Sequence, residues 1–78
     1  MSWTMLDSSM LQAAAYQDQL CALLLRFHGG AVYAYLNAPA SLYQHLLQAD
    51  SKGRYFNSAI RNRFQAVLIS PALSRSRP

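Results

Sequence analysis

The sequence predicts an α+β fold, in which a small three-stranded antiparallel sheet is covered on one face by two helices in the order β-β-β-α-α. A Leu-rich run ends at the pair Gly29-Gly30, which is typical of a β-hairpin turn. Two later segments carry apolar residues at the period of a helix. The 78 residues include one cysteine, so a single small core must stabilise the chain without an internal disulfide.

The three strands are expected over residues 6–16, 20–28 and 31–36, with a turn at residues 17–19. The alanines of the first segment would also accept a helix. Ser8-Ser9 and the hairpin that follows favour a strand there.

A two-residue turn at the Gly-Gly pair determines which residues of the hairpin share a face. It pairs Phe27 with Val32 and Arg26 with Tyr33, and side chains alternate between the faces of a sheet. The face expected to meet the helices is then wholly apolar and holds Cys21, Leu23, Leu25, Phe27, Val32, Ala34 and Leu36.

The opposite face is expected to be open and to show Arg26, His28, Tyr33 and Tyr35 around Leu24. Paired tyrosines beside a cation resemble the platforms on which single-stranded bases stack. The alternative is that both tyrosines are ordinary strand residues that pack sideways on a helix or on the N-terminal segment.

The first helix is expected over residues 40–50, after Asn37-Ala38-Pro39 ends the third strand, and Ser51 is expected to cap the second helix. The apolar stripe of the first helix holds Leu42, Tyr43, Leu46 and Leu47. That of the second helix holds Phe56, Ala59, Ile60 and Phe64.

The polar face of the second helix is the main candidate binding site. In a regular helix Arg54 and Arg61 lie two turns apart on one face, with Asn57 and Ser58 between them. Two guanidinium groups flanked by neutral hydrogen-bonding groups suit phosphate or carboxylate.

Lys52 and Arg63 are expected at the margin of the apolar face. The N–H groups behind Ser51, with Gly53 allowing close approach, could hold an anion. The alternative is a capped surface helix whose arginines are only solvated.

The net charge of +4 is uneven, with −1 over residues 1–49 and +5 over residues 50–78, and the chain has no glutamate. An acidic partner is therefore expected, either nucleic acid (RNA or single-stranded DNA) or an acidic protein surface. No cofactor is expected.

No catalytic or metal site is expected either. Cys21 alternates onto the predicted core face, which indicates an inert buried thiol. Neither His28 nor His45 has another ligand at metal-binding spacing. Ser51 and Lys52 are adjacent, so their side chains diverge on a helix, and three aspartates leave little for carboxylate chemistry.

The run at residues 66–69 is interpreted as an edge strand or as a cover for the core, and Pro71 ends it. A single domain over residues 1–69 and a flexible basic tail over residues 70–78 are expected. The chain lacks a long apolar run and begins without a basic signal region, which favours the cytoplasm and no membrane span.

Several strings together resemble the KTSC domain over about residues 5–64. They are the Gly-rich hairpin with Tyr33-Ala34-Tyr35, residues 43–49, the string Ser-Lys-Gly-Arg-Tyr-Phe-Asn at residues 51–57, and Ile60-Arg61. This family is named after the C-terminal region of some lysyl-tRNA synthetases and also occurs as free-standing small bacterial and phage proteins. Here Asn37-Ala38-Pro39 replaces the usual Val-Pro, and Phe64 stands where the aromatic is often Tyr.

The resemblance implies RNA binding, the function usually suggested for the family. The basic residues then indicate a nucleic-acid-binding module that contacts phosphates, with three tyrosines as stacking candidates. The alternative is a protein-interaction module or stoichiometric inhibitor, for example a phage anti-CRISPR-like protein. The anion-binding candidates are Lys52, Arg54, Asn57, Arg61, Arg63 and Arg26, and the stacking candidates are Tyr33, Tyr35 and Tyr55.

Overall fold

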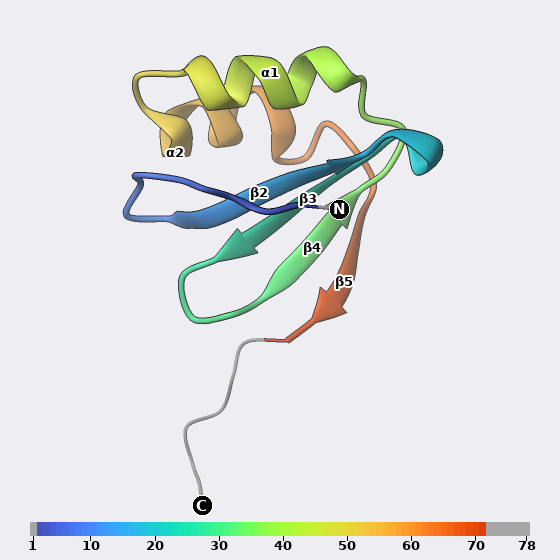
Figure 1. Cartoon of the computed structure of the whole chain (residues 1–78), viewed down its shortest axis with the longest axis horizontal. Coiled ribbons are helices and arrows are strands. Elements are labelled where there is room, and N and C mark those ends of the chain that lie inside the picture. The colour runs from blue at the N-terminus through green and yellow to red at the C-terminus, as the bar shows by residue number, and fades with distance from the viewer. Residues whose placement is uncertain (1, 72–78) are drawn as a thin grey trace, which may run out of the picture.

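The computed structural model describes residues 2–71. Within them, five antiparallel strands form one sheet in the order β1-β2-β3-β4-β5, and the helices between β4 and β5 cover one of its faces (Figure 1). The strands are β1 (Thr4–Met5), β2 (Leu11–Gln17), β3 (Ala22–Phe27), β4 (Val32–Tyr35) and β5 (Ala66–Ser70). The helices are the 3-10 turn η1 (Asp18–Leu20), α1 (Ala40–Gln48), α2 (Lys52–Tyr55) and the π-helix η2 (Phe56–Ile60).

The predicted α+β class, with an antiparallel sheet and two helical segments, is confirmed, whereas the predicted number of strands is wrong. The sheet has five strands rather than three. β1 has only two residues, too few to show a period in the sequence. β5 is the edge strand that the apolar run at residues 66–69 allowed, and it pairs with β4. Of the predicted tail, residues 72–78 lie outside the described part of the chain.

The predicted register of the β3–β4 hairpin is wrong by one residue. Leu25 pairs with Tyr33, and Arg26 pairs with Val32. The loop has three residues, because the N–H of Phe27 donates to the carbonyl of Ala31 at 2.8 Å. Both loop glycines have positive φ, 103° and 105°, which glycine adopts without strain.

In the observed register both tyrosines of β4 lie on the face that the helices cover. Tyr35 is 6% exposed, and its ring meets that of Phe56 edge to face at 5.8 Å between centroids. Val32 and Ala34 lie on the other face instead. The predicted open platform of Tyr33 and Tyr35 is therefore wrong in its placement, and the sideways packing against a helix is what the structure shows.

The core lies between the sheet and the helices, and the predicted stripes of both helices supply it. Leu42 and Leu46 of α1 are buried, as are Phe56 and Ile60 of η2. They pack against Leu11, Ala14, Leu23, Leu25, Tyr35 and Ala38, with Tyr43, Ala59 and Phe64 at the margin.

The second helical segment starts as expected but ends early. The N–H of Arg54 donates to Ser51 Oγ at 3.2 Å, which is the predicted cap. A π-turn then follows, in which the N–H of Arg61 donates to the carbonyl of Phe56 at 2.8 Å. Arg61 itself has extended backbone angles, so the helix ends before it. The prediction that Arg54 and Arg61 share one helix face required a helix that continues through Arg63, and it is therefore wrong.

Cys21 is exposed rather than buried, which corrects the prediction. The turn η1 ends at this residue, whose φ of 49° is left-handed, and β3 starts only at Ala22. The thiol therefore sits on a turn, outside the alternation of the strand.

Candidate functional site

The predicted anion-binding residues lie in three separate places. Lys52, Arg54 and Asn57 line a cavity of about 510 Å³ between the β1–β2 loop and the start of α2, here called the end cavity. Arg61 and Arg63 follow η2. The sixth candidate, Arg26, lies on the other face of the sheet.

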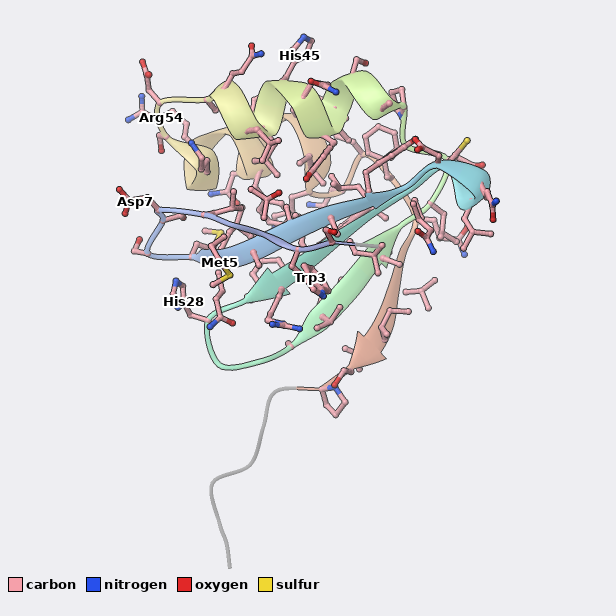
Figure 2. The ribbon with its side chains drawn as sticks, viewed as in Figure 1. Trp3, Met5, Asp7, His28, His45 and Arg54 are labelled. Atoms are coloured by element: carbon pink, nitrogen blue, oxygen red, sulfur yellow. The ribbon has the colours of Figure 1, made fainter. Side chains whose placement is uncertain are left out.

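The end cavity holds charges of both signs. Asp7 and Asp50 line it together with Lys52 and Arg54, and Asp7 and Arg54 lie at the same end of the molecule in Figure 2. Lys52 Nζ donates to the carbonyl of Ala49 at 2.7 Å, which places this ammonium group against the end of α1. The formal charges of these four side chains therefore sum to zero.

Arg61 and Arg63 are exposed in the turn between η2 and β5. Arg61 lies close enough to Tyr35 to affect its titration. Burial raises the pKa of Tyr35 above its ordinary value, Tyr33 adds to the rise, and the positive charge of Arg61 opposes it. The two arginines form a cationic turn, which leads into β5 where Ala66 pairs with Tyr35.

The stacking candidates Tyr33, Tyr35 and Tyr55 all contact the core. The ring of Tyr33 meets Phe27 edge to face at 5.9 Å and lies 6.4 Å from the ring of Tyr35. Tyr33 and Tyr55 are half-buried, so each presents only part of its side chain to solvent.

Arg26 lies on the sheet face that the helices leave open, as its strand position predicted. Its guanidinium carbon lies 4.6 Å from the ring centre of Trp3, within the range of a cation–π contact. The sequence analysis missed Trp3, because the two-residue strand that follows it is too short to show an alternation of apolar and polar residues. The one usable signal was that it is the only tryptophan of the chain.

The two histidines hold no metal-binding arrangement. His28 Nε2 lies 2.8 Å from the carbonyl oxygen of Ser8, so this ring ties the hairpin loop to the β1–β2 loop. His45 points away from the sheet on the outer face of α1 (Figure 2). Across residues 2–71 no group of three or more His, Cys, Asp or Glu could hold a metal ion. The same residues include no helix with the length and apolar character to cross a membrane.

Comparison with known proteins identifies the family. The family model of the KTSC domain matches residues 7–64. This chain belongs to the KTSC domain family. The crystal structure of a KTSC domain protein from Yersinia pestis superposes with a TM-score of 0.82 at 28% identity, and the match covers 88% of this chain and 97% of that one.

Relatives of this KTSC domain occur alone and inside a larger enzyme. A protein of Tsukamurella paurometabola is 41% identical over 63 residues, which are 81% of this chain and 94% of that protein. A lysine–tRNA ligase of Nostoc punctiforme is 32% identical over 64 residues, which are 82% of this chain but only 11% of the ligase. The KTSC domain is thus a small unit that is either free-standing or part of a longer protein.

Proposed function

We propose that this KTSC domain is a non-enzymatic binding module for RNA or single-stranded nucleic acid, and that its cationic turn contacts the phosphates. The exposure of Arg61 and Arg63 carries the proposal. Neither guanidinium group donates a hydrogen bond to any residue from 2 to 71, so both are available to a ligand. The lysine–tRNA ligase relative adds support, because that enzyme acts on an RNA.

The charges favour the cationic turn over the end cavity as the main phosphate site. Arg54 shares the cavity with Asp7 and Asp50, which repel a phosphate. Arg61 and Arg63 have no carboxylate within two residues in the sequence. The half-buried ring of Tyr33 lies next to that of Tyr35 near this turn, where the edge of a base could contact it.

Replacing both Arg61 and Arg63 with glutamine should weaken binding to a single-stranded oligonucleotide and leave the melting temperature nearly unchanged, since exposed charges contribute little to stability. The slope of log K against log salt should fall by about 0.7 for each phosphate that is no longer neutralised. A fluorescence-anisotropy titration at several salt concentrations measures both the affinity and the slope, and a thermal melt checks the stability.

Two matched variants locate the site. Arg54→Gln should reduce the slope less than either arginine of the turn, and Arg26→Gln, on the opposite face of the sheet, should leave it unchanged. Wild-type binding that does not weaken with salt would exclude a phosphate ligand. An equal loss in all four single variants would show that charge alone acts, without a defined site.

A second candidate is a protein-interaction module, which the open edge of β5 favours. In the described chain β5 pairs only with β4, it carries no charge, and Val67, Leu68 and Ile69 are 39%, 50% and 56% exposed. An uncharged apolar edge strand is a ready template for pairing with another strand. A second copy of this chain is the simplest partner. If two β5 strands pair antiparallel, the two Arg63 side chains lie at opposite ends of the pair, so their charges do not repel each other.

The substitution Leu68→Lys tests this second candidate. Sedimentation equilibrium should show concentration-dependent association of the wild type and its loss in the variant, since a charge opposes edge pairing. Leu20→Lys is the matched control, because Leu20 is 67% exposed but lies on the turn η1. A wild type that stays monomeric at every concentration would remove the candidate.

A further inference from the structure

The sheet face opposite the helices forms a groove that the proposed nucleic-acid site does not use. Its volume is about 560 Å³, and its lining includes residues of β2, β3, β4 and β5. We call it the sheet groove; its walls are mainly apolar, with Arg26 and Ser70 among the polar groups. The residues used below are Trp3, Leu24, Arg26, Val32, Ile69 and Ser70.

The register of the β3–β4 hairpin brings Arg26 and Val32 together in this groove. Because Arg26 pairs with Val32, both side chains point away from the helices. Leu24 lies two residues from Arg26 on the same strand and shares that face. Ile69 of β5 also lines the groove, as does Trp3, which lies over the sheet in Figure 2.

Arg26 is the only charged residue that lines the sheet groove in the described chain. Its contact with Trp3 uses the face of the indole ring, and its guanidinium donates no hydrogen bond to any other residue between 2 and 71. A half-buried arginine among apolar side chains loses hydration without gaining a protein acceptor. An anionic ligand would supply that acceptor.

We propose that the sheet groove binds a small carboxylate carried on an aromatic or branched apolar body. The carboxylate would accept two hydrogen bonds from the planar guanidinium of Arg26, a geometry that lysine cannot provide. The apolar body would fill the space between Leu24, Val32 and Ile69. A volume of about 560 Å³ lies within the range of small-molecule sites, roughly 300–1,000 Å³.

This site is independent of the proposed nucleic-acid function. The cationic turn lies where η2 leads into β5, whereas the sheet groove lies on the opposite side of the sheet from the helices. A polynucleotide also suits the groove poorly, because one arginine and mainly apolar walls offer few partners for its sugars and phosphates.

Trp3 provides a direct signal for the test, because it is the only tryptophan and it touches Arg26. Titration with 4-phenylbutyrate should change its fluorescence saturably, and calorimetry should give the same affinity. The neutral amide of the same compound, which lacks the charge, and acetate, which lacks the apolar body, should each bind at least about tenfold more weakly.

Variants identify the residue responsible. Arg26→Gln should lower the calorimetric affinity for 4-phenylbutyrate at least about tenfold and leave that for the amide unchanged. Arg26→Lys keeps the charge and is a second check on folding. Its affinity for 4-phenylbutyrate should lie between those of the wild type and Arg26→Gln. Arg63→Gln removes an arginine outside the groove and should have no effect.

Three results would overturn the proposal. The first is equal affinities for 4-phenylbutyrate and its amide. The second is a loss of affinity for 4-phenylbutyrate in Arg63→Gln as large as that in Arg26→Gln. The third is no saturable binding at all. A fourth result would also overturn it: if Trp3 emission changes with protein concentration alone in the Leu68→Lys variant, in which pairing along β5 is lost, a second copy occupies the groove.

Discussion

Replacing Phe56 with alanine should lower the free energy of unfolding by about 3–5 kcal/mol, the largest single-residue loss that we expect in this KTSC domain. Phe56 is 6% exposed and joins the helical layer to the sheet. Its ring meets Phe27 at 5.4 Å and Tyr35 at 5.8 Å, edge to face in both cases. Removing it deletes two aromatic pairs and leaves a cavity that the short second helix cannot close.

Urea unfolding followed by circular dichroism measures this loss. Small domains have only about 5–15 kcal/mol of total stability, so Phe56→Ala could be largely unfolded in buffer. Phe56→Leu keeps most of the volume and should cost less, so it provides a measurable second value. Asn57→Ala, an exposed neighbour, should change stability by less than about 0.5 kcal/mol. A loss below about 1 kcal/mol for Phe56→Ala would contradict the packing of η2 on the sheet.

Replacing Leu46 with alanine should cost about 2–5 kcal/mol. Leu46 is 0% exposed and lies at the centre of the apolar face of α1, so the three carbon atoms removed leave a void in the core. The contacts of α1 with β2 and β3 depend on this face. A thermal melt in parallel with urea unfolding gives the loss by two routes.

Leu20→Ala is the matched control for this substitution, because it removes the same atoms from a side chain that is 67% exposed. It should stay within about 0.5 kcal/mol of the wild type. If Leu20→Ala and Leu46→Ala lowered stability equally, α1 would not pack on the sheet through the face described.

The sequence alone predicted the local elements well, because their signals are local. Leu42 and Leu46 are four residues apart, which places them on one face of a helix, and both are buried as predicted. Ser51 caps the second helix through the side-chain contact that its residue type favours. The string at residues 51–57 and the hairpin also indicated the KTSC family, and the family model confirms it.

The hairpin register could not be decided from the sequence. Two consecutive glycines fit both a two-residue and a three-residue loop, and one extra residue reverses the face of every side chain in β4. Both registers bury apolar residues, since β4 alternates Val32 and Ala34 with Tyr33 and Tyr35. The helices decide between them, because Phe56 packs its ring against Tyr35.

The sequence by itself therefore determined the family, the α+β class, the two apolar helix faces and the positive charge of residues 50–78. Tertiary structure alone decided that the tyrosines of β4 face the core and that Arg26 meets Trp3 in a groove. The physical reason is the range of the interactions. Caps and helical periods depend on residues within a few positions of one another, whereas the register and the groove depend on contacts between strands distant in the sequence.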